Sequence, residues 1–360
     1  MGDNSEKTAT FGMHKTNFMK KNIQNRLLYI IGIGVVLVCV FVSGLIFSSL
    51  LNIEKSVEFK IFPNQSVEVV VQNLENQGRI KHKKWLRFML NVVDYKDRVH
   101  PGLYELKPGM SNFQLIRRLR SGLQTPVKLT FNNVRTIEEL AGKFSRQLMA
   151  DSTAFLTSFQ DSMWLDSMKF TPNNAICIFI PDTYEVWWNI NPEKLRNKFM
   201  DSWTYFWNDK RKEEASRIKL SPVEVSILAS IVEEETKKVD EMPKVAGLYL
   251  NRLRIEMPLQ ADPTVKFAVG DFTIRRILLE HTRIQSPYNT YLNIGLPPGP
   301  IRLPSKVAIE ATLQAMRHTY IYMCAKDDFS GYHAFATTYQ QHQNNAVKYR
   351  QALNKRGIMN

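Results

Sequence analysis

The chain has 360 residues, of which 44% are hydrophobic and 23% charged, a composition typical of folded domains and not of disordered segments. The formal net charge of +14 favours polyanionic partners: nucleic acid, anionic lipid or an acidic polymer. The sequence has no zinc-finger spacing, RNA-binding aromatic signature or dense Arg/Lys helix, so nucleic acid is not expected as a partner. The seven histidines show no paired metal-site spacing, so neither a metal nor a cofactor is expected.

An uncharged apolar run near the N-terminus determines the expected compartment. Residues 27–51 read LLYIIGIGVVLVCVFVSGLIFSSLL, longer than the roughly 20 residues that cross a bilayer. Basic residues outnumber acidic ones in the preceding tail, so residues 1–26 are expected in the cytoplasm. This predicts a single-pass inner-membrane protein whose residues 52–360 are periplasmic. The alternative is a cleaved signal peptide, although no A-x-A-like site follows the run.

Residues 52–131 predict a small α+β module. The pattern indicates strands at 57–62, 103–106 and 125–131, and helices in the stretches 67–78, 82–93 and 111–122. The second of these helices is expected to bury Trp85, Phe88, Met89 and Val92. The order of strand, two short helices and strand resembles a LysM-type glycan-binding fold. A purely structural module is the alternative.

Residues 132–360 are expected to form a mainly helical catalytic domain with a small sheet, so the fold class is α+β. Between residues 164 and 207 the segment is dense in aromatic residues, which stack well on sugar rings but are more simply explained as core. Cys177 and Cys324 could form a disulfide or remain as free thiols.

A helix with a complete start signature follows at Ser221. Ser221 is a predicted N-cap, proline follows it, and Glu224 stands at the third helical position. On a helical wheel the apolar face centres at roughly 60–80°, and Glu235 falls at roughly 80°. Glu233 falls on the opposite side and Glu234 at the border. Of three consecutive glutamates, only Glu235 is therefore predicted to point inward.

An inward carboxylate has two interpretations. Burial raises the pKa of a carboxyl group, as a general acid that works near neutral pH requires. Alternatively, Glu235 lies past the buried part of the helix, which is expected to run to about residue 238, and forms a structural ion pair. The periodicity alone does not decide between them.

The downstream sequence supplies candidate cleft residues. A second helix is predicted at 243–254, followed by MPLQADPT and by the proline-rich loop QSPYNTYLNIGLPPGPI at 285–301. Long ordered loops are usually functional, and His333 is predicted on a short strand beside Phe335. The polar residues expected to bind substrate are Gln260, Asp262, Thr264, Ser286, Tyr288, Asn289, Tyr291 and His333. Each could instead be loop or core scaffolding.

Six segments in this order resemble the endolytic murein transglycosylase family (MltG, YceG-like): ASIVEEET, NRL, LQADPTV, SPYNTY, GLPPGPI and HAFATT. The segment PDTYE and the predicted anchor and module agree with the family's layout. The resemblance implies that the glutamate before the threonine of the E-x-E-T pattern, Glu235, is the catalytic acid/base. This sequence departs from the family at Glu234, where the family often has lysine.

The resemblance implies a lytic transglycosylase that cleaves the β-1,4 bond between N-acetylmuramic acid and N-acetylglucosamine within peptidoglycan strands. The expected products carry 1,6-anhydro ends. The implied partners are the inner membrane, nascent glycan strands and the wall-synthesis proteins. Cleavage of a nascent strand would end its elongation. Two alternatives remain: a lysozyme-like hydrolase, with Asp262 as a second carboxylate, and a non-catalytic wall-binding scaffold. Asp262 could also be a turn residue that caps the helix after Pro263, and His333 a core histidine.

Overall fold

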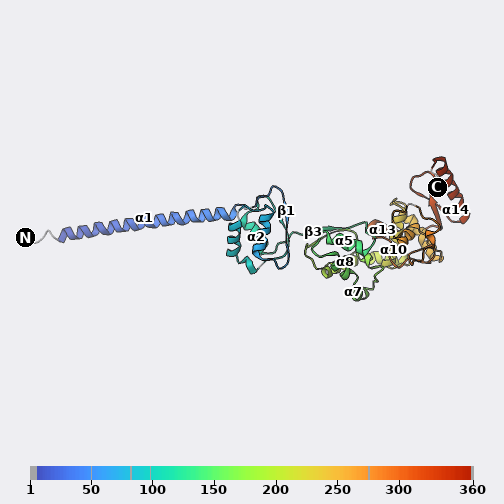
Figure 1. Ribbon diagram of the computed structural model, residues 1–360, viewed down its shortest axis with the longest axis horizontal. Helices are drawn as coiled ribbons and strands as arrows, with labels where there is room; N and C mark the ends of the chain where they lie inside the picture. Colours follow the sequence, from blue (N-terminus) through green and yellow to red (C-terminus); the bar gives the residue numbers. More distant parts are fainter. Residues whose placement is uncertain (1–5, 50, 82, 98, 275, 358–360) are drawn as a thin grey trace, which may run out of the picture. The chain divides into compact units, whose positions relative to one another are not determined.

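The computed structural model describes residues 6–49, 51–81, 83–97, 99–274 and 276–357. It divides into two compact units, Met1–Thr125 and Pro126–Asn360, and its mixture of helices and small sheets confirms the α+β class (Figure 1). Residues 1–5 of the expected cytoplasmic tail lie outside the described residues.

Helix α1 (Glu6–Phe47) contains residues 27–47 of the apolar run. Its window Asn25–Phe47 is long and apolar enough to cross a membrane by length and composition. The predicted span of 27–51 is too long at its C-terminal end, because Leu51 is buried in the core of the first unit and forms a β-bridge with Ile80. The Asn112 side chain donates a hydrogen bond of 2.6 Å to the Leu45 carbonyl, which fastens the end of α1 to the unit.

The first unit contains one antiparallel pair of strands, β1 and β2, in which Val57 pairs with Leu106 and Ile61 pairs with Gly102. Its buried residues come from both strands and from the helices around them. In chain order its elements are β1 (Val57–Ile61), α2 (Val67–Asn76), α3 (Lys83–Val92), the 3-10 turn η1 (Tyr95–Asp97), β2 (Gly102–Leu106) and α4 (Asn112–Arg120).

Two expectations for this unit are wrong in part. Helix α3 buries Leu86 and Leu90 and packs Trp85 and Met89 against the core, whereas Phe88 and Val92 are exposed. The strand expected at 125–131 is β3 (Val127–Thr130), which pairs with β4 (Thr183–Val186) of the second unit. The unit boundary therefore falls after Thr125 and not after residue 131, because the hydrogen bonds of β3 lie with the later strand.

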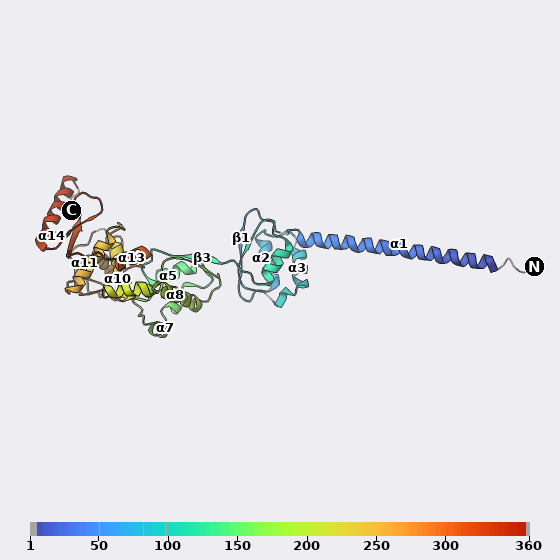
Figure 2. The same cartoon turned by 180° about the vertical axis from the view of Figure 1, so that it is seen from behind.

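The second unit is mainly helical, and its described residues also form two antiparallel pairs of strands, β3–β4 and β5–β6. In both views α10 and α13 lie close together, while α5 and α8 gather toward the other end of the unit (Figure 2). Its further elements are α5 (Ile137–Ser145), α6 (Ser152–Phe159), α7 (Ser162–Ser167), η2 (Ala175–Ile178), α8 (Pro192–Phe206), α9 (Asp209–Arg217), α10 (Pro222–Glu235), α11 (Met242–Arg254), α12 (Asp262–Val269), η3 (His281–Arg283), α13 (Lys306–Leu313), β5 (Tyr322–Ala325), β6 (His333–Ala336) and α14 (Tyr339–Lys355).

Helix α10 is the central element of this unit. Every residue from Val225 to Val232 is buried, with Ile227 in one hydrophobic cluster and Leu228, Ile231 and Val232 in the next. The single apolar face assumed on the wheel is therefore wrong: the helix is covered on all sides, as a helix in the interior of a domain is. Its predicted capping box between Ser221 and Glu224 is confirmed.

The aromatic-rich segment is mostly core. Trp164, Phe179 and Trp207 are buried, whereas Trp187 is 50% exposed. Cys177 is buried and Cys324 half-buried, and both are free thiols, so the alternative of a disulfide is not realised.

Candidate active site

Glu235 is the last residue of α10, three residues short of the expected end of the helix. Its Oε1 accepts a hydrogen bond of 2.6 Å from the hydroxyl of Tyr249, a buried residue of α11. Its Oε2 has no hydrogen-bond partner in the part of the chain that the structure describes. The residue keeps some solvent exposure, but protein atoms enclose the carboxyl group. One oxygen is thus fixed and the other is left for an incoming group.

The electrostatic surroundings of Glu235 favour a proton on the carboxyl group. Burial raises its pKa to about 7, and the negative charge of Asp262 adds to the rise. The Tyr249 hydrogen bond opposes the rise, as do the positive charges of His333 and Arg252. Near neutral pH, a carboxyl group with this pKa is present in comparable amounts as the protonated and the ionised form, so it can give and take a proton.

The two preceding glutamates have structural roles. Glu234 lies 3.2 Å from Arg135 and pairs with Arg302. Burial alone would raise the pKa of Glu234, but these arginines and Lys237 lower it below its usual value. Glu233 accepts a hydrogen bond of 3.0 Å from the Ser305 backbone. Both side chains are mostly buried. The wheel placed Glu233 on the side opposite the apolar face, but the loop before α13 covers that side of α10.

His333 begins strand β6 and is held by Glu241. The Glu241 carboxylate accepts hydrogen bonds from the His333 backbone N–H at 2.7 Å and from Nδ1 at 2.9 Å. Glu241 is only 5% exposed. His333 is therefore a mostly buried side chain whose orientation is fixed by Glu241, and it interacts electrostatically with Glu235.

Arg252 is a second buried cation near Glu235. Its Nε donates to the Ile321 carbonyl at 2.7 Å and its Nη1 to the Leu259 carbonyl at 2.6 Å. Burial lowers the pKa of Arg252, but the guanidinium stays charged at any physiological pH. It ties α11 to the segments before α12 and β5.

Asp262 is the first residue of α12 and is bonded to the proline-rich loop. Its Oδ1 accepts a hydrogen bond of 2.6 Å from the Tyr291 hydroxyl. The N-cap of α12 is Ala261, without a side-chain cap, so the capping role considered for Asp262 is wrong. Burial and the Asp262 carboxylate raise the pKa of Tyr291, and Glu235 adds to this rise. Asp262 and Tyr291 are therefore electrostatic neighbours of Glu235.

Two predicted substrate-binding residues are scaffolding. Thr264 is fully buried, and its hydroxyl bonds the Ala261 carbonyl at 2.7 Å and the Thr290 hydroxyl at 2.8 Å. Asn289 is also fully buried; its amide donates to the carbonyls of Thr282 and Ile284. Both side chains use their polar atoms on the loop itself, so neither offers them to a substrate.

The remaining predicted residues are spread around the loop. Gln260 is exposed, has a φ of 49° and donates its backbone N–H to Thr290. The Ser286 hydroxyl accepts from the Tyr288 backbone N–H at 3.2 Å. The Tyr288 ring packs on Phe267, with 4.7 Å between centroids. Ser286 and Tyr288 therefore stabilise the loop, whereas the side chain of Gln260 is exposed just before α12.

Sequence reasoning missed three residues of this centre: Tyr249, Arg252 and Glu241. Tyr249 lies within the predicted helix 243–254, and Arg252 lies in the quoted NRL segment. Their spacing of three residues places both on one face of α11, which was a usable signal. Nothing in the sequence pairs Glu241 with His333, because 92 residues separate them.

The chain is similar to known proteins over most of its length. A model of the YceG-like family matches residues 59–348. A Bacillus subtilis protein named endolytic murein transglycosylase is 28% identical over 320 residues, covering 84% of this chain and 87% of that protein. Streptococcus pneumoniae proteins of the same name are 28% identical over 335 residues. The chain covers only 59% of their length.

A solved structure shares the fold. The crystal structure of a YceG-like protein from Listeria monocytogenes superposes with a TM-score of 0.52 at 24% identity. The superposition covers 81% of this chain and 99% of that one.

Proposed function

Since this chain belongs to the YceG-like family, we propose that it is an endolytic lytic transglycosylase of peptidoglycan. It cleaves the β-1,4 bond between N-acetylmuramic acid and N-acetylglucosamine inside glycan strands. The observation that carries the proposal is the enclosed carboxyl group of Glu235, with a pKa near 7, one oxygen held by Tyr249 and the other unpartnered among the described residues. The names of the Bacillus and Streptococcus relatives support the same reaction.

The reaction needs one group that acts first as an acid and then as a base. Protonated Glu235 gives its proton to the glycosidic oxygen, and the bond from that oxygen to the muramoyl anomeric carbon breaks. The resulting carboxylate takes the proton of the muramoyl 6-hydroxyl, whose oxygen then bonds to the same anomeric carbon. The products are a strand ending in 1,6-anhydro-N-acetylmuramic acid and a strand with a new N-acetylglucosamine hydroxyl. Glu235 regains its proton, and no water is consumed.

The neighbours of Glu235 have distinct proposed roles. Asp262 helps to keep Glu235 protonated, and Tyr291 holds Asp262 in place. His333 and Arg252 favour the carboxylate that forms after proton transfer. Gln260, Asp262, Tyr291 and His333 are the proposed substrate contacts, and Thr264 and Asn289 support them from behind.

We also propose the setting of this activity. The apolar helix anchors the chain in the inner membrane, with residues 1–26 in the cytoplasm and residues 52–360 in the periplasm. There it cuts nascent strands beside the wall-synthesis proteins and ends their elongation. The first unit has the order β1, α2, α3, β2 with antiparallel strands, which supports a LysM-like, glycan-binding role.

Analysis of the product ends tests the reaction. The purified full-length chain is incubated with peptidoglycan strands, and the products are measured by mass spectrometry. We expect ends that are lighter by one water than reducing ends, as a 1,6-anhydro ring requires. Reducing ends would assign the chain to the hydrolase alternative, with Asp262 as the second carboxylate.

A further inference from the structure

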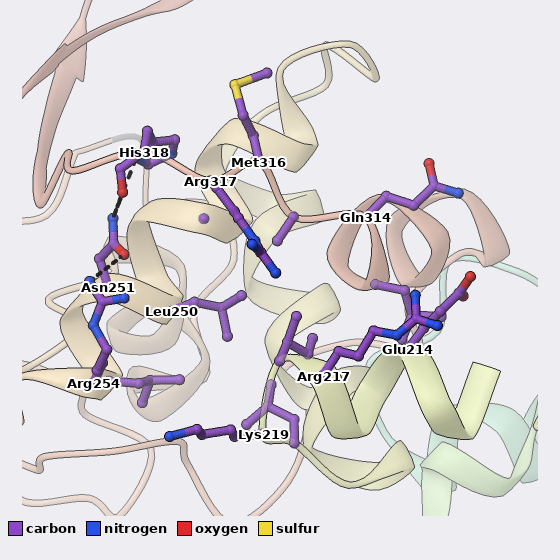
Figure 3. Close-up of a pocket in the computed structure, with 16 residues that line it drawn as sticks. Glu214, Arg217, Lys219, Leu250, Asn251, Arg254, Gln314, Met316, Arg317 and His318 are labelled. Carbon is purple, nitrogen blue, oxygen red and sulfur yellow. Dashed lines mark hydrogen bonds between the residues drawn. The ribbon is translucent and has the colours of Figure 1, made fainter. Parts of the chain in front are cut away.

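A cavity lies on a different face of α11 from the one that meets Glu235. It has a volume of about 910 Å³, within the range of roughly 300–1,000 Å³ typical of ligand sites. The walls come from the end of α9, from the C-terminal half of α11 and from the segment after α13 (Figure 3). Tyr249 and Arg252, which face the catalytic centre, are not among its lining residues.

The lining is strongly basic. Four side chains with permanent positive charge border the cavity, Arg217, Lys219, Arg254 and Arg317, against one carboxylate, Glu214. Figure 3 shows Arg317 extending from the segment after α13 into the space between Leu250 and the α9 residues. Such a concentration of one sign in a concave site raises the local concentration of anions.

Two of these cations are available to a ligand. Arg217 lies 2.7 Å from Glu213, and Arg254 donates to the Asn251 side chain at 3.0 Å. The side chains of Lys219 and Arg317 have no hydrogen-bond or ion-pair partner among the residues that the structure describes. An arginine fork and a lysine charge in one cavity suit a ligand with oxyanion groups.

The wall that carries Arg317 is fixed to α11. Gly247 lets the chain pass close to the helix, because a Cβ at that position would lie 2.2 Å from the Met316 carbonyl oxygen. Asn251 donates to the carbonyls of His318 and Tyr320, at 2.8 and 2.9 Å. The cavity is therefore a built feature that shares α11 with the catalytic centre.

We propose that this cavity binds free carboxylates of the short peptides that peptidoglycan strands carry, through Arg317 and Lys219. This rests on the proposed function for the source of the peptide, and it adds a determinant of substrate specificity. A helix is about 10–12 Å wide with its side chains. A peptide of about five residues extends up to roughly 17 Å. A peptide on a glycan bound at Glu235 can thus reach around α11.

Direct binding tests the site. Calorimetry on the full-length chain uses the peptide Ala-Glu-Glu with free carboxylates as the probe, and Ala-Gln-Gln amide as its uncharged match. We expect the acidic peptide alone to bind, and Arg317→Gln or Lys219→Gln to weaken binding about tenfold each. Lys212→Gln, an exposed lysine of α9 outside the cavity, is the control and should bind as the original chain does.

Kinetics test the source of the carboxylate. Arg317→Gln should raise KM for peptide-bearing strands about tenfold with kcat unchanged, and leave KM for peptide-free strands as it was. Equal binding of the amide, unchanged binding by both variants, or displacement of the peptide by equimolar inorganic phosphate would overturn the proposal. Weakened binding with unchanged KM would assign the site to a free carboxylate and overturn the link to the substrate. Cleavage of peptide-free strands by the original chain tests the proposed function separately.

Discussion

The Tyr249 hydroxyl donates a hydrogen bond of 2.6 Å to Glu235 Oε1. It holds a carboxyl group at the end of α10 whose pKa burial has raised to about 7. The bond fixes the direction of the carboxyl group and, because it stabilises the ionised form, limits how far the pKa rises. The proposed acid/base is therefore tuned by two opposing effects, each of which a single substitution can remove.

Tyr249→Phe should raise the pKa of Glu235, because it removes a donor that stabilises the carboxylate. Cleavage requires protonated Glu235 at the start, so activity falls as pH rises through this pKa. The falling limb of kcat/KM, near pH 7 in the original chain, should move upward by about one pH unit in the variant. Tyr184→Phe, whose hydroxyl bonds the Ile180 carbonyl, is the control. An unmoved limb in Tyr249→Phe would show that this bond does not set the pKa.

Asp262→Asn should have the opposite effect. The negative charge of Asp262 raises the pKa of Glu235, so its removal should move the falling limb to lower pH. The products should keep their 1,6-anhydro ends, since Asp262 takes no part in the bond changes proposed. Complete loss of cleavage across the whole pH range would instead give Asp262 a direct chemical role.

The raised pKa of Glu235 has a consequence for stability. Between the unfolded value of 4.5 and the folded value of about 7, the folded state holds a proton that the unfolded state has lost. The contribution of Glu235 to the free energy of unfolding therefore falls as pH rises through this window, by about 3 kcal/mol. Glu235→Gln, which cannot ionise, should be more stable than the original chain at pH 8, and this advantage should vanish near pH 4.5. Denaturant unfolding at several pH values measures this; a gap that does not change with pH would contradict the raised pKa.

Glu234→Gln should destabilise the fold without changing the chemistry. Glu234 is half-buried and faces Arg135 and Arg302, so a neutral side chain leaves Arg135 without its paired carboxylate and Arg302 with Glu233 alone, at 3.5 Å. We expect a loss of about 2 kcal/mol in the free energy of unfolding. The products and the pH profile of the folded fraction should be unchanged. A shifted pH profile would mean that Glu234, and not Glu235 alone, controls the proton.

Local sequence signals predicted the local structure well. The capping box predicted at Ser221 begins its helix as expected, because its two partners, Ser221 and Glu224, lie within four residues. The wheel correctly selected Glu235 as an enclosed residue, although its premise of one apolar face was wrong. Loops from other parts of the chain cover the rest of α10 and engage Glu233 and Glu234.

Contacts between segments that are distant along the chain could not be predicted from the sequence. Tyr249 meets Glu235 across two helices, and His333 meets Glu241 over 92 residues, so both depend on how the unit packs. Polar residues in the loop could not be sorted into substrate contacts and scaffolding either. Thr264 and Asn289 have the same chemistry as cleft residues, and only their burial and internal hydrogen bonds exclude them.

The most direct test of the central claim compares the original chain with Glu235→Gln on purified glycan strands, with products identified by mass spectrometry. Glutamine keeps the size of the side chain and can still accept the Tyr249 hydrogen bond, but it cannot give or take a proton. The account predicts 1,6-anhydro ends from the original chain and a loss of at least about 100-fold in their rate of formation for the folded variant. Undiminished cleavage by Glu235→Gln would contradict it.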